Sequence, residues 1–382
     1  MLLHISNDYS GSPVYKNLIR ELDNLGIVQV IYNPVREQNR VDKNAVEFKT
    51  EGSKIIYRPI LNYHLDRIFY PWKIRKVLGD IQKHVDLTKI DFIHAHTWYS
   101  DGGVAYELAK KYKIPYIVTI RNTDINLFQK KLKYVRPYGR KILDKAQKVI
   151  LIAASYKNRI LSQNSLRTIL PELQQKLEII PNGVDPFWIK EVQEKTLNRK
   201  EKYKFLYIGK FNSGKNVLNL VEAVKRINEE GISCTLELVG GGGKDEIEIL
   251  KQTEEFPEIF TYHGKVYDKK KLKEIFQSCD IFAMPSRNET FGLVYVEAML
   301  QGLPILYTEG EGIDKFYEES IGEKVSKQSG EFEIRQALLK LMENYNNYQI
   351  PTEKLLENHD WKEIARRYRK IYYKNNNLSI IS

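Results

Sequence analysis

Very few cysteines occur in this sequence: Cys234 and Cys279 are the two among 382 residues. Two thiols cannot build a disulfide framework or a cysteine-rich zinc site. The sequence also lacks an apolar run of the ~18–20 residues that a membrane-spanning helix needs. Its first residues, MLLHISNDYSGSP, contain neither the basic segment nor the long apolar segment of a secretory signal. We therefore expect a cytoplasmic protein.

No Asp-x-Asp triplet and no internal repeat occur anywhere in the chain. A divalent cation held by paired aspartates is thus not expected to bridge a diphosphate here. We predict no metal and no other cofactor. Lysine ammonium groups and helix amides would have to carry the charge of any diphosphate that the protein binds.

Basic residues outnumber acidic residues, 60 to 49, which gives a net charge of +11. This balance suggests an anionic partner, which is a nucleic acid, an anionic membrane or a phosphorylated ligand. It does not choose between them, and an AT-rich coding genome would produce the same lysine-rich composition. The apolar content of 42% suits a folded chain, and the length suits two large domains.

Short β-rich apolar runs alternate with helical patterns, and the alternation occurs twice. It predicts an α/β protein with two doubly wound parallel sheets, in domains 1–185 and 186–360. The helical pattern at 361–382 is expected to pack back onto the first domain. Since ligands bind outside the carboxyl ends of such strands, we expect a site in a cleft between the two domains. Strands are predicted at 1–6, 27–32, 92–96, 114–120, 148–153, 177–181, 204–209, 234–240, 261–264, 280–285 and 304–307.

The segment Pro285-Ser-Arg-Asn-Glu-Thr-Phe-Gly-Leu-Val-Tyr-Val-Glu297 follows a strand and leads into a helix. Gly292 permits a tight turn, and the amides near Phe291, Gly292 and Leu293 would lie at the helix N-terminus, where a phosphate binds well. Glu289 and Glu297 stand on either side of this turn, where they suit the hydroxyls of a sugar. The spacing alone equally allows a capping role for Glu289 and a surface position for Glu297.

Two lysines lie in the loop after the first strand of the second domain, in Tyr207-Ile-Gly-Lys-Phe-Asn-Ser-Gly-Lys215. Gly209 precedes Lys210, and Lys215 ends the loop, so two ammonium groups could neutralise a diphosphate. The loop is not a P-loop, because the residue after Lys215 is Asn. A solvated basic turn is the alternative. The run Gly240-Gly-Gly-Gly243 after another strand allows a close ligand approach or a flexible turn.

These motifs resemble, in order and spacing, those of the retaining glycosyltransferases of family 4. E-T-F-G-L-V-Y-V-E has that family's E-x7-E signature. I-P-N-G-V-D at 180–185, G-K-x4-K at 209–215, L-V-G-G-G at 238–242, H-G-K-V at 263–266 and G-L-P-I at 302–305 accompany it. The first domain matches more loosely, through D-F-I-H-A-H at 91–96. The resemblance implies a GT-B fold of two Rossmann-like domains.

It also implies transfer of a hexosyl group from a UDP-sugar or GDP-sugar to an acceptor, with retention of configuration. Because the Asp-x-Asp motif is missing, we expect this transfer to be metal-independent, and we expect the acceptor to be a glycan or a polyprenyl-linked glycan. By the same resemblance, Glu297 would hold the ribose hydroxyls and Glu289 would contact the donor sugar. Lys210 and Lys215 would bind the diphosphate. The backbone of Lys265 and Val266 would read the edge of the base.

The family commonly has a histidine after the strand at 114–120, and this sequence has Arg121-Asn-Thr-Asp124 there. Arg121 cannot act as a general base, because it stays protonated. It is expected to contact a phosphate or a sugar hydroxyl, and Asp124 to contact a hydroxyl. A local ion pair between them is the alternative. His96 is predicted at the cleft and His94 in the packing. Gly11 matches the family's glycine-containing first loop.

The segment 128–148 carries eight Lys or Arg residues and one Asp, with Tyr134, Val135, Tyr138, Ile142 and Leu143 among them. Such a mixture can lie on an anionic membrane surface. It predicts a peripheral protein at the inner face of the plasma membrane that uses a lipid-linked glycan, as in bacterial capsule or other surface-polysaccharide assembly. A helix with a buried apolar face and solvated lysines is the alternative.

Two other functions compete with the transferase. A nucleotide-sugar epimerase on the same fold would need acid–base residues placed to abstract a proton, and the E-x7-E set argues against it. A nucleic-acid-binding protein is supported by the charge alone, since no helix-turn-helix, zinc or RNP pattern is visible. We therefore expect no nucleic-acid partner.

Overall fold

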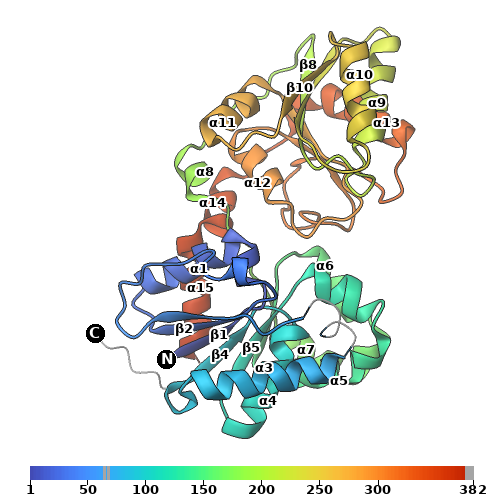
Figure 1. The fold of residues 1–382 in the computed structure, drawn as a ribbon. Helices are drawn as coiled ribbons and strands as arrows, with labels where there is room; N and C mark the ends of the chain where they lie inside the picture. Colours follow the sequence, from blue (N-terminus) through green and yellow to red (C-terminus); the bar gives the residue numbers. More distant parts are fainter. Residues whose placement is uncertain (63–65, 67–68, 375–382) are drawn as a thin grey trace. The chain divides into compact units, whose positions relative to one another are not determined.

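The computed structural model describes residues 1–62, 66 and 69–374, which form two compact units (Figure 1). Unit 1 consists of residues 1–152, residues 156–183 and the chain from Trp361 onward. Unit 2 consists of residues 153–155 and 184–360. Each unit is a parallel sheet with helices on both faces, so the predicted α/β class with two doubly wound sheets is confirmed.

Unit 1 contains a seven-stranded parallel sheet in the order β3-β2-β1-β4-β5-β6-β7. Its central strands are buried apolar runs, as expected of strands covered on both faces. The register places Leu2 beside Gln29 on one side and beside Phe92 on the other. The strands are β1 (Leu2–Ile5), β2 (Gln29–Pro34), β3 (Lys54–Arg58), β4 (Phe92–Ala95), β5 (Tyr116–Ile120), β6 (Lys148–Leu151) and β7 (Leu177–Ile179).

Two groups of helices cover this sheet. The first and last helices, α1 and α15, pack against each other, and α3, α4 and α5 form the second group on the opposite face (Figure 1). Residues 361–374 of the helical pattern predicted at 361–382 are therefore part of the core of unit 1, and residues 375–382 lie outside the described residues. The helices are α1 (Pro13–Asn24), α3 (Tyr70–His84), α4 (Ser100–Tyr112), α5 (Arg136–Lys145), α6 (Ser155–Leu161), α7 (Leu170–Lys176) and α15 (Trp361–Lys374).

Unit 2 contains a six-stranded parallel sheet in the order β10-β9-β8-β11-β12-β13. Chain order reverses direction between β8 and β11, as it does between β1 and β4 in unit 1. The two cysteines are buried in this unit and are not bonded to each other, in line with the expectation from their number. The strands are β8 (Tyr203–Gly209), β9 (Cys234–Gly240), β10 (Phe260–Gly264), β11 (Ile281–Ala283), β12 (Ile305–Thr308) and β13 (Gly322–Val325).

The helices of unit 2 also divide between the two faces of its sheet. Helix α9 packs against α10 and α13, whereas α12 packs against α8 and α14. These helices are α8 (Pro186–Lys190), α9 (Val217–Glu229), α10 (Glu246–Glu255), α11 (Lys269–Ser278), α12 (Leu293–Leu300), α13 (Glu331–Glu343) and α14 (Thr352–His359).

No helix within residues 1–62, 66 and 69–374 combines the length and the apolar character that crossing a bilayer requires. This result agrees with the absence of long apolar runs in the sequence.

Candidate donor site in unit 2 and polar cluster in unit 1

The loops after β8 and β11 meet at the point where the strand order of unit 2 reverses. The Arg287 amide donates a hydrogen bond to the Gly214 carbonyl oxygen at 2.9 Å, and the Ser286 hydroxyl lies 3.3 Å from the same oxygen. Such a switch point is the usual ligand position in an open α/β sheet, because the loops on either side diverge. The lysine loop and the glutamate segment are thus joined, as the sequence led us to expect.

At this junction Lys215 and Glu289 form an ion pair with an Nζ–Oε2 distance of 2.5 Å. Both side chains are largely buried, with 25% and 14% of their surface exposed. The Glu289 amide donates to a carboxylate oxygen of Glu311 at 3.0 Å, and Lys327 pairs with the other oxygen of Glu311 at 2.7 Å. Two lysines and two glutamates are therefore linked, in the order Lys215, Glu289, Glu311 and Lys327, across the loops that follow β8, β11, β12 and β13.

Glu311 is a residue of this cluster that the sequence analysis missed. It stands between two glycines after β12, and a Cβ atom at Gly312 would lie 2.6 Å from the Phe291 carbonyl oxygen. Gly312 also has a positive φ of +49°, a backbone conformation that favours glycine, so this turn requires glycine at position 312. An acidic residue between two glycines, shortly after a strand, was the feature of the sequence that could have indicated this residue.

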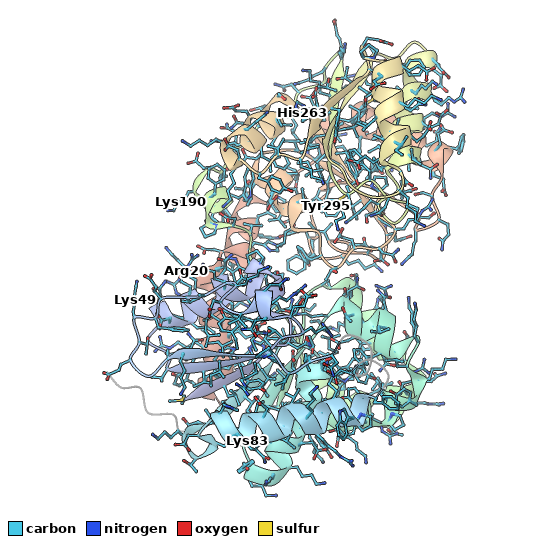
Figure 2. All side chains as sticks on the ribbon, viewed as in Figure 1. Arg20, Lys49, Lys83, Lys190, His263 and Tyr295 are labelled. Carbon is cyan, nitrogen blue, oxygen red and sulfur yellow. The ribbon has the colours of Figure 1, made fainter. Side chains whose placement is uncertain are left out.

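The start of α12 requires glycine at position 292. Gly292 has a φ of +78°, and a Cβ atom there would lie 2.5 Å from the ring of Tyr295, a residue labelled in Figure 2. No side chain among the described residues caps the N-terminus of α12, which begins at Leu293. The amides of Phe291, Gly292 and Leu293 lie at this N-terminus, a position at which an anion binds well.

The glycine run after β9 lies against the backbone of the lysine loop. A Cβ atom at Gly240 would lie 1.9 Å from the Gly209 carbonyl oxygen, and the Phe211 amide donates to the Gly242 carbonyl at 3.1 Å. The run is therefore required by close packing between two loops. Lys210 is exposed on this loop.

A Cβ atom at Gly242 would lie 3.7 Å from the Lys265 ammonium nitrogen. The Lys265 side chain is exposed, and that of Val266 is partly exposed. This loop after β10 thus joins the loops after β8 and β9 at the same end of the sheet.

Glu297 has different neighbours from Glu289. Burial, and then the nearby Asp185 carboxylate, raise the pKa of Glu297 to about 7, although Lys269 and a hydrogen bond with Trp188 act in the opposite direction. Asp185 caps the N-terminus of α8 and pairs with Lys269 at 2.6 Å. The two glutamates of the E-x7-E segment consequently occupy two separate electrostatic environments.

In unit 1, Arg121 lies among the loops after β1, β4 and β5. Its guanidinium covers the ring of Tyr15 at 4.6 Å from the centroid, and its Nε donates to the His96 carbonyl at 2.9 Å. Burial raises the pKa of Asp8 in the first loop, and the charge of Arg121 opposes that rise. A Cβ atom at Gly11 would lie 2.4 Å from an Asp8 carboxylate oxygen, so the Asp8 side chain would have to move if a larger residue stood there. Asp8 is a second residue that the sequence analysis missed.

Asp124 is 1% exposed, and its carboxylate accepts hydrogen bonds from the backbone amides of Trp98, Tyr99 and Arg121 at 3.0, 3.1 and 2.9 Å. Burial raises its pKa to about 6, although these amides favour the charged form. The geometry gives Asp124 the role of joining the loops after β4 and β5. It shows neither the expected contact position for a hydroxyl nor a side-chain ion pair with Arg121.

Three buried histidines of unit 1, His4, His94 and His96, have ring nitrogens within 4.8 Å of one another. His94 is packed as predicted, since its nitrogens lie 2.8 Å from the Tyr372 hydroxyl and 3.0 Å from the Thr119 hydroxyl. His96 is only 2% exposed, and its Nε2 lies 2.9 Å from Nδ1 of His4. With these contacts made, the cluster is a hydrogen-bonded part of the core, and burial lowers the pKa of all three rings.

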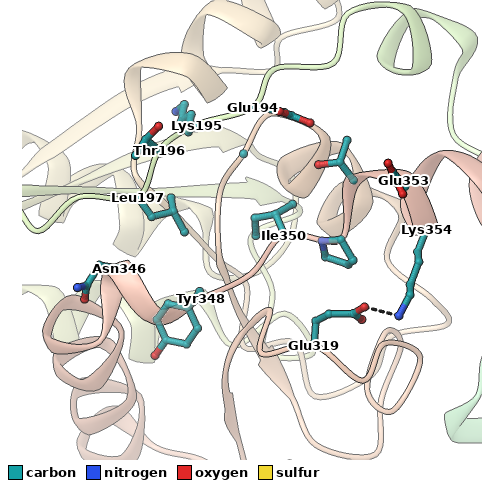
Figure 3. A pocket seen from close by; sticks show the side chains of 13 residues that line it. Glu194, Lys195, Thr196, Leu197, Glu319, Asn346, Tyr348, Ile350, Glu353 and Lys354 are labelled. Carbon is teal, nitrogen blue, oxygen red and sulfur yellow. Dashed lines mark hydrogen bonds and ion pairs between the residues drawn. The ribbon is translucent and has the colours of Figure 1, made fainter.

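A separate pocket of about 600 Å³ lies in unit 2, between the segment after α8 and the segment that leads into α14 (Figure 3). Glu319 and Lys354 form an ion pair at its wall. None of the site residues predicted from the sequence lines this pocket. It is therefore distinct from the cluster at the strand ends.

Two parallel-sheet units, one of which has lysines, glutamates and a helix N-terminus at its switch point, form the arrangement of a GT-B fold. Residues 12–187 match the family model for Glycosyltransferase Family 4, and residues 189–367 match that for Glycosyl transferases group 1. The chain belongs to this glycosyltransferase family, as the resemblance of its motifs indicated.

The names of similar proteins indicate different products. A probable sucrose-phosphate synthase of Thermosipho melanesiensis is 26% identical, over 75% of this chain and 70% of the relative. Alpha-monoglucosyldiacylglycerol synthase of Acholeplasma laidlawii is 23% identical, over 79% of this chain and 77% of the relative. The crystal structure of Anabaena HepE in complex with UDP shares the fold, with a TM-score of 0.66, 14% identity and coverage of 98% of this chain and 99% of that one.

Proposed function

We propose that the protein transfers a hexosyl group from a UDP-sugar or GDP-sugar with retention of configuration. The observation that carries this proposal is the Lys215–Glu289 ion pair at the switch point of unit 2, beside the uncapped start of α12. The UDP complex of the structurally similar HepE supports a nucleotide donor. A screen of UDP-sugars and GDP-sugars, by donor hydrolysis and by thermal shift, tests the proposal. Failure of every nucleotide to bind would contradict it.

The ion pair suggests how the donor would engage unit 2. A diphosphate is a stronger partner for Lys215 than one carboxylate is, because it carries more charge and more acceptor oxygens. When Lys215 and Lys210 hold the diphosphate, Glu289 is released to accept hydrogen bonds from hydroxyls of the donor sugar. Glu289 would then be positioned by the hydrogen bond that its backbone amide donates to the Glu311 carboxylate.

Glu297 would hold the ribose hydroxyls. An ionised carboxylate accepts hydrogen bonds through both oxygens, which suits two adjacent hydroxyls. Because the pKa of Glu297 is raised to about 7, this contact would strengthen as the carboxylate ionises near neutral pH. Lys265 and Val266, in the loop after β10, would contact the base.

The transfer would not need a metal ion. The departing diphosphate acquires charge in the transition state, and preorganised ammonium groups and helix amides can stabilise that charge. Lys215 and the first turn of α12 provide both in this unit.

The acceptor would be a glycan or lipid-linked glycan in bacterial surface-polysaccharide assembly, at the inner face of the plasma membrane. The glycolipid synthase of Acholeplasma supports a lipid acceptor by its name, and the eight basic residues of segment 128–148 support an anionic surface. The apolar residues proposed for that contact need correction, however. Ile142 and Leu143 are fully buried and Val135 is 3% exposed, so the apolar face of α5 belongs to the core. Liposome flotation with charge reversal at Lys131 and Lys133 tests whether the basic segment alone gives binding.

A further inference from the structure

An apolar groove of about 480 Å³ opens on unit 1 beside α3 and α5. This volume lies within the range of ~300–1,000 Å³ that is usual for small-molecule sites. Most of its lining comes from Tyr70, Pro71, Ile74, Leu78, Val135 and Tyr138.

The hydroxyl groups of two lining tyrosines already have hydrogen-bond partners. The Tyr70 hydroxyl donates to the Tyr99 carbonyl oxygen at 2.8 Å, and the Tyr138 hydroxyl donates at 2.8 Å to Glu107, which also lines the groove. These side chains therefore offer their rings to an occupant, and an apolar occupant fits the groove better than a polar one.

Three exposed aromatic side chains lie in the two chain segments that line the groove. Phe69 is 56% exposed, Trp72 is 63% exposed and Tyr134, which also lines the groove, is 57% exposed. Such residues are usually buried in a soluble domain, and Trp and Tyr gather where an apolar phase meets a wet one. The aromatic residues come from two elements, the start of α3 and the turn before α5, so this surface is not a single amphipathic helix.

Basic side chains accompany these aromatic residues. Arg75 lines the groove, and Lys131 and Lys133 are exposed next to Tyr134 in the chain. Segment 128–148 as a whole has eight basic residues against one acidic residue. This charge complements the phosphate of an anionic lipid, and the attraction is confined to about a Debye length from the surface.

We propose that this groove takes up a hydrocarbon chain of an anionic membrane lipid. Trp72, Phe69 and Tyr134 lie at the boundary between headgroups and chains, while Arg75, Lys131 and Lys133 contact lipid phosphates. The inference rests on the proposed function in one respect: unit 1, docked in this way, meets a lipid-linked acceptor at the bilayer surface.

Tryptophan fluorescence of the full chain tests this inference directly. Trp98, Trp188 and Trp361 are at most 2% exposed, so a change on lipid binding reports Trp72. With vesicles of phosphatidylglycerol and phosphatidylcholine at low salt, we expect a blue shift, and quenching when the acyl chains carry bromine. Vesicles of phosphatidylcholine alone should give much weaker binding.

Variants separate the groove from general surface charge. Leu78→Glu and Tyr134→Ser should reduce vesicle binding at least ~10-fold, a loss well beyond that of single surface substitutions. Tyr267→Ser is the matched control, because Tyr267 is 85% exposed in unit 2. If Leu78→Glu fails to fold, Tyr134→Ser and Trp72→Ser, read by flotation, carry the same test at surface positions.

Three results would overturn the proposal. They are no binding to anionic vesicles at low salt, binding without quenching by brominated chains, and a Trp72 shift that depends on protein concentration alone and so reports self-association. UDP binding, measured on the same variants, should be unchanged. If the protein docks on lipid but binds no nucleotide, the proposed function is contradicted, whereas the proposal that the groove binds a lipid chain still holds.

Discussion

At the scale of single residues, the two glutamates of the E-x7-E segment have different surroundings, and this difference predicts different roles in the candidate donor site. Glu289 is held by Lys215, whereas burial and the Asp185 carboxylate hinder the ionisation of Glu297. We predict that Glu297→Gln weakens UDP binding ~10-fold or more, whereas Glu289→Gln mainly lowers kcat. A contact made chiefly in the transition state affects turnover when it is lost. Calorimetry with UDP and steady-state kinetics on both variants make the comparison, and equal losses of UDP affinity would contradict the separate roles.

The raised pKa of Glu297 makes a prediction about pH. Its carboxyl is protonated below about pH 7 and ionised above it, and the ionised form accepts more hydroxyl hydrogen bonds. UDP affinity should therefore rise as pH increases through 7, at up to ~10-fold per unit, and level off above 8. Glu297→Gln is the control, because it keeps the titration of the diphosphate but not of the carboxyl. A wild-type profile parallel to that of the variant would rule out this assignment.

Lys215 should contribute to turnover through its charge. Lys215→Met keeps the aliphatic stem but removes the ammonium, and we expect kcat to fall on the order of 10²-fold. The matched control is Lys324→Met, since Lys324 forms an ion pair with Glu309 that is largely exposed. Single-turnover kinetics with a saturating donor measure the effect, and similar rates for the two variants would contradict it.

At the scale of elements, the turn into α12 is restricted in two ways, by its positive φ and by the Tyr295 ring. Gly292→Ala should cost about 2 kcal/mol or more of stability and should also lower turnover, because α12 carries both the amides and Glu297. Gly231→Ala isolates the backbone effect, since φ is +85° there and nothing lies within 4 Å of the added Cβ. Urea unfolding of both variants gives the difference, and equal costs would show that Tyr295 accommodates a side chain.

The alternation of apolar runs predicted most of the strands and the doubly wound sheets, because buried parallel strands are nearly continuous apolar segments. It missed β3 and β13, which lie at sheet edges and carry exposed or charged residues. It also missed α3, whose exposed Trp72 and buried Ile74 and Val77 blur the usual division between a polar and an apolar face.

Site residues were predictable where a motif is local and not where a contact is distant. The E-x7-E segment and the lysine loop were recognisable, but the ion pair joins residues 74 positions apart. The buried role of Asp124 depends on amides of Trp98 and Tyr99, contributed by another loop, so its position in the sequence gave no indication of it.

At the scale of the whole molecule, a metal-independent mechanism has a direct test. We expect EDTA to leave the transferase activity unchanged, because in the proposed mechanism lysines and helix amides stabilise the diphosphate. Activity lost with the chelator and restored by Mn²⁺ would show that a cation performs this role and would contradict the interpretation of the missing Asp-x-Asp motif.

The stability of unit 1 depends on α15, because this helix packs into the core of unit 1 although the chain first passes through unit 2. Trp361, Ile364, Tyr368 and Tyr372 of α15 share one buried cluster with α1 and the central strands, as their helical spacing predicted. A charge at Ile364, which is fully buried, would have no partner there. Ile364→Asp should therefore destabilise unit 1 by about 3 kcal/mol or more.

UDP distinguishes the thermal transitions of the two units in this experiment, because a ligand raises the melting temperature of the unit that binds it. We expect Ile364→Asp to lower the thermal transition that UDP does not shift, and to leave the UDP-stabilised transition of unit 2 in place. Lys370→Asp, at an exposed position of the same helix, controls for the charge change. Loss of the UDP-stabilised transition in Ile364→Asp would show instead that unit 2 cannot fold without unit 1, and that α15 supports the donor site as well as the core in which it lies.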